Sequence, residues 1–279
     1  MPHALHLNLD DAWDPETAAL SLLDATEWGP KLRFSAPARV LENFFGEYRD
    51  RLGAFILYGS GDFHHLTALW IRRVRESVVV ISFDNHPDWD VRPPWWCCGG
   101  WVNRALELPQ VRKISVWGCG NFERRWPGQF FGNCRAVCEG KLEVHAWADD
   151  RASGKQQRRR AIFRATWRDE FERFVTELAE GNIYITVDLD CLKPGEAVTN
   201  WENGKFTTED MAWALGRLRK EAHVIGGDIC GAYSRPKYAR WKQQFLSKMD
   251  HPKLPQPDKT QADEINRAAL EKLWPILAD

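Results

Sequence analysis

The chain has 279 residues, a formal net charge of −1 at pH 7 and 44% hydrophobic residues. This length is enough for one large domain with a substantial hydrophobic core. The near-zero net charge argues against a nucleic-acid or membrane-surface protein, and no apolar run is long enough to span a membrane.

Strand and helix signals alternate along the chain. Short apolar runs bounded by turn residues predict strands, in chain order at His3–Leu9, Ala54–Tyr58, Val78–Ile81, Val111–Trp117, Leu142–Trp147, Ile183–Val187 and His223–Ala232. Helical spacing or capping residues predict helices, which begin near Pro15 and then cover Pro37–Arg51, Ala68–Arg75, Val102–Leu108, Ala161–Ala179, Thr207–Lys220, Pro236–Met249 and Asp263–Leu273. This alternation is typical of an α/β fold with a parallel sheet.

A glycine-rich turn, Gly59–Thr67, follows the strand at Ala54–Tyr58. It places His64 at the carboxyl end of that strand, where ligands bind in open α/β sheets. A lone histidine more often has a structural role. Acidic residues at the ends of two later strands nevertheless favour a functional role for His64.

Two of the predicted strands end in acidic residues spaced two apart. Asp84, His86 and Asp88 follow the first of these strands, and Asp188 and Asp190 follow the second. Alternate residues of an extended chain lie on one face, so these side chains should converge at the carboxyl ends of the strands. Four carboxylates held together repel one another unless cations lie between them. The sequence therefore predicts a site for two divalent ions.

The loop after Asp88 is rich in tryptophan and carries no secondary-structure signal. It contains Trp89, Trp95 and Trp96, and its paired prolines exclude a helix. Exposed tryptophans are unfavourable unless they pack against something. We therefore expect these side chains either to close over the metal site or to fill a subunit interface.

Four segments resemble, in the same order, motifs of the arginase and agmatinase (ureohydrolase) family. They are Gly61-Asp62-Phe63-His64-His65-Leu66-Thr67, Asp84-Asn85-His86-Pro87-Asp88, Asp188-Leu189-Asp190-Cys191-Leu192-Lys193-Pro194 and Gly226-Gly227-Asp228-Ile229-Cys230. The resemblance implies a three-layer α/β/α fold with a largely parallel sheet (arginase-like). We expect a single domain over residues 1–279, with a charged helical C-terminal extension from about residue 235.

The resemblance also implies two manganese ions, although other divalent metals suit similar ligands. One ion would be held by His64, Asp84, Asp88 and Asp188, and the other by Asp84, His86, Asp188 and Asp190. A hydroxide bridging the two ions would attack the trigonal carbon of an amidine, guanidine or amide and break a non-peptide C–N bond. His64, and not His65, aligns with the metal-binding histidine of the family.

The substrate side departs from the family pattern. Gly231 stands where the family has a guanidinium-binding glutamate, Cys98 stands where it has a histidine, and residues 198–207 replace its substrate loop. We therefore expect a substrate other than arginine, one that is less cationic and more apolar or planar. The residues predicted to contact it are Trp89, Trp96, Trp201 and Asp228, and the candidate catalytic residues are Asp88 and Cys98.

The residues leave alternatives open. Cys98 is either a proton donor or nucleophile near the ions, or a small buried side chain. The chain is alternatively a metal-binding arginase-fold protein without catalysis that serves as an interaction module. A deacetylase-like amidohydrolase with a single zinc ion is a third alternative, but Asp88 and Asp190 complete a second set of ligands and favour two ions.

Cysteine content and the first residues bear on location and partners. The seven cysteines are odd in number and scattered, unlike a disulfide framework, and Met1-Pro2-His3-Ala4 opens no signal peptide. We expect a cytoplasmic enzyme with a small-molecule substrate and no nucleic-acid or membrane partner, and we leave a homo-oligomer open. The basic segment Arg151–Arg160 lacks interleaved aromatic residues and is expected to be solvated.

Overall fold

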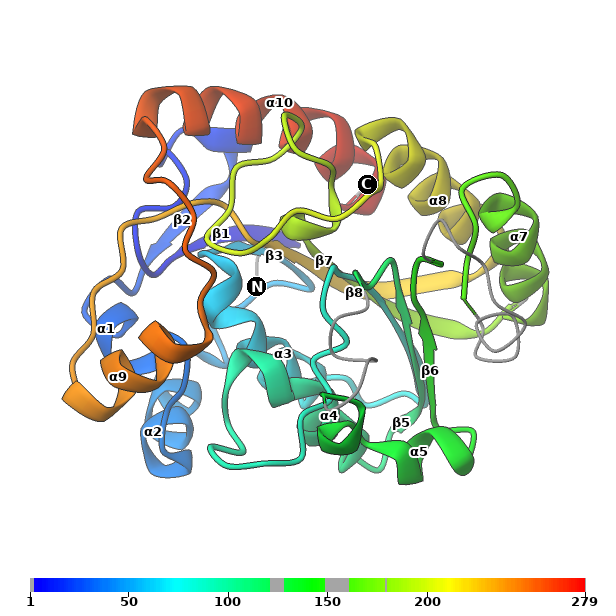
Figure 1. The fold of residues 1–279 in the computed structure, drawn as a ribbon, viewed down its shortest axis with the longest axis horizontal. Coiled ribbons are helices and arrows are strands. Elements are labelled where there is room, and N and C mark those ends of the chain that lie inside the picture. Colours follow the sequence, from blue (N-terminus) through cyan, green and yellow to red (C-terminus); the bar gives the residue numbers. More distant parts are fainter. Residues whose placement is uncertain (1–2, 121–127, 149–160, 179, 279) are drawn as a thin grey trace.

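The computed structural model describes residues 3–120, 128–148, 161–178 and 180–278. Within these residues, an eight-stranded sheet forms the centre of the molecule (Figure 1). All of its paired strands are parallel, in the order β2-β1-β3-β8-β7-β4-β5-β6. The strands are β1 (Ala4–Asn8), β2 (Ser21–Asp24), β3 (Phe55–Tyr58), β4 (Val78–Phe83), β5 (Val111–Trp117), β6 (Leu142–His145), β7 (Asn182–Asp188) and β8 (His223–Cys230).

Helices cover both faces of the sheet, which produces three layers (Figure 1). On one face lie α2 (Ala38–Tyr48), α3 (Thr67–Ile71) and α4 (Trp101–Leu106), and on the other lie α7 (Trp167–Glu177), α8 (Thr208–Glu221) and α10 (Lys259–Ala278). The remaining helices are α1 (Gly29–Leu32), α5 (Cys134–Cys138) and α9 (Trp241–Asp250). The predicted three-layer α/β/α fold class with a parallel sheet is confirmed. No described helix has the length and apolar character needed to cross a membrane.

The apolar patterns of the sequence account for these elements. In α2 the buried residues are Leu41, Phe44, Phe45 and Tyr48, which form one stripe along the helix. All six residues of β4 are buried, because a strand in the middle of a parallel sheet is covered by helices on both faces. Thr207 and Asp210 form a capping box that starts α8.

Three parts of the chain differ from the prediction. The sequence pattern does not predict β2, because this edge strand exposes three of its four residues and has no apolar run. The helix expected near Pro15 is a single 3₁₀ turn, Thr17–Ala19. Farther along, α7 begins at Trp167 and not at Ala161, since Ile162 forms a β-bridge with Trp147. The basic segment at 151–160 lies outside the described residues.

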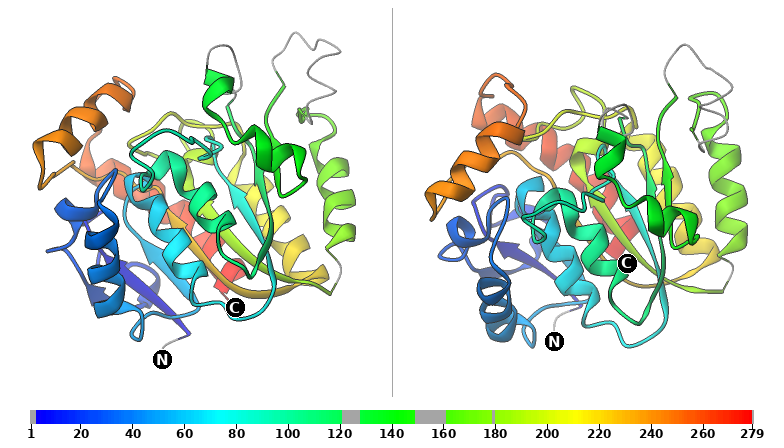
Figure 2. Two further views of the ribbon diagram at one scale, coloured as in Figure 1. Left: turned by 90° about the horizontal axis from the view of Figure 1, so that it is seen from below. Right: turned by 60° about the horizontal axis from the view of Figure 1, so that its bottom comes forward.

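The chain after residue 235 contains two helices of different character. The peripheral helix α9 lies on the same side of the molecule as α1 and α2 (Figure 2), and its Trp241 and Met249 are 72% and 71% exposed. The last helix, α10, buries Leu270, Leu273 and Leu277 in the core that it shares with α8. The final helix thus forms part of one covering layer of the sheet.

Candidate metal centre

The candidate site lies at the carboxyl ends of adjacent strands of the sheet. β4 and β7 pair in register up to their ends, so Asp84, which follows β4, and Asp188, which ends β7, lie side by side. A 3₁₀ helix after β3, Gly61–Leu66, carries His64 to the same edge. Because parallel strands all end on one side of the sheet, this topology assembles residues from distant motifs.

His64 is the centre of a first group of candidate ligands. Its Nδ1 atom lies 3.1 Å from Oδ2 of Asp84, 3.2 Å from Oδ2 of Asp88 and 3.6 Å from Oδ2 of Asp188. All four side chains are buried, and Nδ1 forms no hydrogen bond within the described part of the chain. A buried imidazole nitrogen that faces three carboxylate oxygens is arranged as in a metal site.

His86 forms a second group with Asp190 and Asp84. Its Nδ1 atom lies 2.8 Å from Oδ2 of Asp190 and 3.6 Å from Oδ1 of Asp84. Asp84 therefore presents Oδ2 to the His64 group and Oδ1 to the His86 group. A carboxylate that divides its oxygens in this way is suited to bridge two ions.

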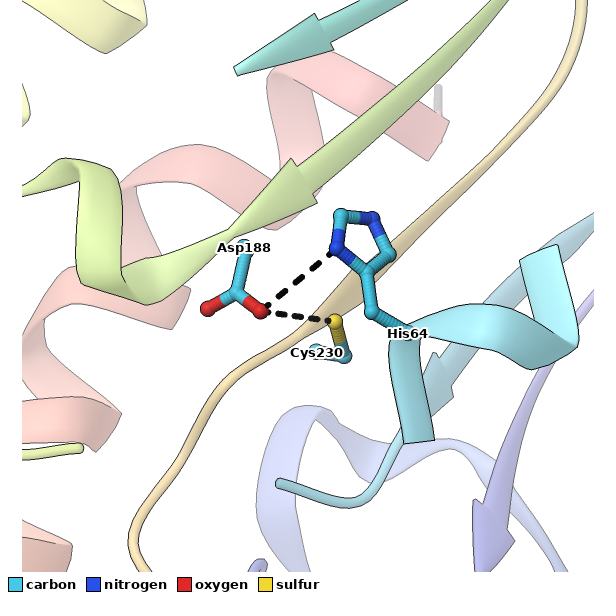
Figure 3. Close-up of side chains that lie close together, drawn as sticks. All are labelled: His64, Asp188 and Cys230. Carbon is cyan, nitrogen blue, oxygen red and sulfur yellow. Dashed lines mark hydrogen bonds and ion pairs between the residues drawn. The ribbon is translucent and has the colours of Figure 1, made fainter. Parts of the chain in front are cut away.

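A third group contains a cysteine that the sequence analysis does not place in the site. Ligand atoms of His64, Asp188 and Cys230 all lie within 4.8 Å of one another (Figure 3). The same limit holds for the groups His64–Asp84–Asp88 and Asp84–His86–Asp190. The structure thus brings together all six predicted ligands. His65 is buried but belongs to no such group among the described residues.

Burial and mutual repulsion change the protonation of these carboxylates. Burial, together with the charge of Asp84, raises the pKa of Asp88 to about 7. Burial and the neighbouring carboxylates also raise the pKa of Asp188 and, more strongly, that of Asp190. Burial acts in the same direction on Asp84, but the close approach of His64 and His86 outweighs burial and holds its pKa below the usual range. Bound cations would relieve this repulsion.

Burial lowers the pKa of the two histidines, whereas the neighbouring carboxylates raise it. Burial lowers the pKa of His64, but the adjacent carboxylates of Asp84 and Asp88 outweigh burial and raise it. Burial also lowers the pKa of His86, but the charge of Asp190 outweighs burial and raises it. A metal ion bound at these nitrogen atoms would compete with protons for them.

A buried polar layer lies behind His64. Its Nε2 atom is 2.9 Å from Oγ1 of Thr186, which donates at 2.6 Å to Oδ1 of Asp228. Tyr184 and Thr67 also donate to the fully buried Asp228. The predicted contact between Asp228 and substrate does not fit this position. Asp228 instead holds the hydroxyl that orients His64, as partners of metal-binding histidines commonly do.

A cavity of about 110 Å³ opens onto the candidate ligands. Apart from those ligands it is lined by Gly61, Cys98, Gly99, Trp201, Glu202 and Asp250. Cys98 and Trp201 therefore lie where the sequence analysis expects them. Burial raises the pKa of the Cys98 thiol well above its usual value, which favours a proton donor over a thiolate nucleophile.

Trp89 and Trp96, which are predicted to contact substrate, do not line this cavity. Trp89 is buried in the core, where its ring packs against Gly132. Trp96 is half-buried and packs against the same core, and its carbonyl accepts a hydrogen bond from the backbone of Ala36. Packing of apolar rings against the core thus takes the place of the expected substrate contact.

The mouth of the cavity includes residues that the sequence analysis does not identify. Asp250, the last residue of α9, lines the cavity. The ring of the next residue, His251, stacks on Trp201 with centroids 4.2 Å apart. Its Nε2 atom lies 2.7 Å from Oδ1 of Asp62, to which the Trp201 indole also donates. No local pattern marks these residues, because the contacts join segments that are far apart in the sequence.

Gly231, at the position of the family's glutamate, has a backbone that only glycine adopts readily. Its φ angle is +104°, and a Cβ atom there would lie 2.2 Å from Oδ1 of Asp188. No side chain can therefore enter the cavity from this position. Glu202, half-exposed at the mouth, is the alternative carboxylate, and its Oε2 lies 3.7 Å from Nε2 of His86.

Comparison with known sequences finds a distant relative. No family model matches the sequence. An uncharacterized protein from Thermotoga maritima is 26% identical over 194 residues, which cover 69% of this chain and 62% of that protein. The chain therefore spans less than two thirds of the length of this relative.

Solved structures with a similar fold include ureohydrolases. A Clostridium difficile protein provisionally assigned as an agmatinase has a TM-score of 0.59 and 17% identity over 99% of this chain and 97% of its own. Arginase from Medicago truncatula has a TM-score of 0.55 and 15% identity, and the match covers 99% of this chain and 86% of the arginase chain. A formiminoglutamase variant from Trypanosoma cruzi with Mn²⁺ has a TM-score of 0.52 and 13% identity, and the match covers 99% of this chain and 92% of that structure. These likenesses show that the chain has the arginase and agmatinase (ureohydrolase) fold.

Proposed function

We propose that this chain is a metal-dependent hydrolase that cleaves a C–N bond other than a peptide bond. The observation that carries the proposal is the arrangement of Asp84, whose two oxygens face two separate groups of buried ligands. The fold supports the proposal, because it is shared with an arginase and with a protein provisionally assigned as an agmatinase.

The donor set fits two divalent ions. Nδ1 of His64 and Oδ2 of Asp84 are buried and form no hydrogen bond with the described residues, so their lone pairs are available to a cation. Mixed carboxylate and imidazole ligands suit manganese, which is present in the formiminoglutamase structure. The proposed ligands of one ion are His64, Asp84, Asp88 and Asp188, and those of the other are Asp84, His86 and Asp190, with Asp188 as a second bridge.

The residues of the chain divide the chemical work of hydrolysis among them. Two divalent ions, when bound, act as Lewis acids and lower the pKa of water to about 7. Asp88 accepts a hydrogen bond from the Trp101 indole at 2.7 Å, and it is our candidate for taking up the proton of the attacking water. Cys98 lines the cavity, and it is our candidate for giving a proton to the departing nitrogen.

The cavity restricts the substrate to a small molecule or the small end of a larger one. Its volume of about 110 Å³ is well below the roughly 300–1,000 Å³ of pockets that take drug-sized ligands. Glu202 and Asp250 at the mouth favour nitrogen groups that donate hydrogen bonds. Only Trp201 of the three predicted tryptophans lines the cavity, so the expectation of an apolar substrate loses most of its support. Gly231 supplies no carboxylate, and free arginine is therefore not the proposed substrate.

Metal analysis followed by a substrate panel tests the proposal. Protein purified without chelators should contain about two divalent ions per chain, as two-metal hydrolases do. The manganese-loaded protein should release ammonia or urea from at least one member of a panel of amidines, guanidines and amides. Asp84→Ala should abolish both properties. His65→Ser is the matched control, because His65 is a buried neighbour of His64 outside the ligand groups.

Two outcomes would favour the alternatives. Ions bound at full occupancy, with no turnover of any member of the panel, would indicate a metal-binding interaction module. A single tightly bound zinc ion that Asp190→Ala does not affect would indicate a deacetylase-like amidohydrolase.

A further inference from the structure

Cys230 is the last residue of β8 and lies beside a candidate metal ligand. In the register of β7 and β8 it pairs with Asp188. Its side chain is fully buried, and its Sγ atom lies 3.5 Å from Oδ2 of Asp188 (Figure 3). That oxygen is also 3.6 Å from Nδ1 of His64. One carboxylate oxygen therefore lies close to both an imidazole nitrogen and a thiol sulfur, and the three atoms are within 4.8 Å of one another.

These separations match the spacing of ligands around one ion. With bond lengths of about 2.3 Å to sulfur and about 2.1 Å to nitrogen or oxygen, tetrahedral ligands of zinc lie roughly 3.4–3.6 Å apart. The sulfur–oxygen and nitrogen–oxygen distances here are 3.5 Å and 3.6 Å. The nitrogen is itself buried and forms no hydrogen bond within the described chain, so it points toward the place that such an ion would occupy.

We propose that Cys230 is a ligand of the ion held by His64, Asp188 and their neighbours, and that this position prefers a softer divalent metal than manganese. The inference rests on the proposed function in that it assigns a further ligand to the same metal site. Thiolate sulfur favours zinc and iron, whereas carboxylates and water favour manganese and magnesium. The thiol gives its proton to solvent when the ion binds.

The two metal positions then differ in chemical character. The group of Asp84, His86 and Asp190 offers two carboxylates and one imidazole, which suit a harder ion. The group that includes Cys230 offers a sulfur, a nitrogen and carboxylate oxygens. The expected loading is a zinc or iron ion in the position that includes Cys230 and a manganese ion in the position of Asp84, His86 and Asp190, and Cys230 is its determinant.

A cobalt-substituted protein provides the direct test. Co²⁺ bound to a thiolate has a charge-transfer absorption band in the near ultraviolet, and Co²⁺ bound only to oxygen and nitrogen does not. The full chain, loaded with Co²⁺ after removal of its metals, should show this band. Cys230→Ser should lose the band and should weaken zinc binding by more than about tenfold, with little change in manganese binding at the other position.

Two other cysteines serve as matched controls. Cys191→Ser removes a fully buried thiol next to Asp190, and Cys98→Ser removes the thiol that lines the cavity. Both variants should keep the band. A band lost in Cys98→Ser and kept in Cys230→Ser would overturn the inference.

The spectrum of the unmodified protein separates the two proposals without any variant. Bound Co²⁺ with no thiolate band would contradict the role of Cys230 and leave the proposed hydrolase intact. Failure to bind any divalent ion would contradict the proposed function itself.

Discussion

The hydroxyl of Thr186 lies 2.9 Å from the Nε2 atom of His64, on the side of the ring away from the candidate metal ligands. The same hydroxyl donates to Asp228, so its lone pair is directed at the imidazole. This contact holds the ring with Nδ1 toward the carboxylates of the site. The orientation of a candidate ligand therefore depends on Thr186 of β7, which is not among the residues that line the cavity.

Removal of this hydroxyl should weaken metal binding. Thr186→Val keeps the size of the side chain but leaves Nε2 of His64 without its partner. We expect metal affinity to fall by about 10–100-fold, as for other partners of metal-binding histidines. Titration with Mn²⁺ and Zn²⁺ measures the change. Thr186→Ser keeps a hydroxyl and should bind nearly as tightly as the unmodified protein; equal losses in both variants would show that the hydrogen bond is not responsible.

The two ligand groups predict different metal contents for two aspartate variants. Asp84→Ala removes a side chain that faces both His64 and His86, and it should empty both positions. Asp190→Ala removes a contact of His86 only, and it should lower occupancy mainly at one. Elemental analysis of each purified variant measures metal ions per chain. The same content in both variants would contradict the shared role of Asp84.

A buried ion-pair network beside the site should be important for stability. Arg33 is 1% exposed, with Nε 2.6 Å from Asp62 and Nη1 3.1 Å from Asp10. Arg33→Met removes the guanidinium that neutralises both buried carboxylates, and we expect the free energy of unfolding to fall by about 3–5 kcal/mol. Arg72→Met is the control, because Arg72 pairs with Glu42 at the surface and its loss should cost at most about 1 kcal/mol. Urea unfolding measures the free energy of unfolding of both variants. Similar decreases in the two variants would contradict the larger contribution of the buried Arg33 network.

His6 should make the fold sensitive to acid. Burial lowers its pKa from 6.5 to about 4, and its Nδ1 atom is buried without a hydrogen bond among the described residues. As the pH falls below about 6.5, the unfolded chain takes up a proton that the folded chain binds only near pH 4. Folding stability should therefore be full above this window and should decrease through it, by about 3 kcal/mol at pH 4.

The variant His6→Leu isolates this effect. Position 6 pairs with Leu22 and Leu57 in the sheet, so an apolar side chain suits it. Urea unfolding of both proteins from about pH 4 to pH 7 should show that the free energy of unfolding of the unmodified protein falls relative to that of the variant as the pH decreases, since all other groups titrate in both. A constant difference across this range would contradict the role of His6.

Free arginine and agmatine should be poor substrates. A buried guanidinium needs an anionic partner, and Gly231 cannot supply one because a Cβ atom there would lie 2.2 Å from Asp188. Urea release from both compounds by the manganese-loaded protein is the measurement, beside a neutral amide and an aromatic amidine. Efficient turnover of arginine that is lost in Glu202→Gln would show that Glu202 replaces the missing carboxylate and that the prediction is wrong.

The sequence by itself determined the fold class and the set of candidate ligands. Alternation of strand and helix signals, which depends on local apolar periodicity, predicts an α/β fold with a parallel sheet, and the resemblance to the ureohydrolase family implies its three layers. The spacing of Asp84, His86 and Asp88 depends on one strand alone, because alternate residues share a face. The edge strand β2 was not predicted, because prediction depends on local apolar patterns and a strand with little buried apolar surface has none.

The tertiary structure alone decided which other side chains reach the site. Cys230 lies beside Asp188 because of the register between β7 and β8, and Asp228 lies behind His64 because Thr186 stands between them. Trp89 follows a candidate ligand in sequence but packs into the core, while His251 reaches Trp201 from the distant end of α9. Strand register and loop paths follow from the packing of the whole chain, so no single segment encodes these contacts.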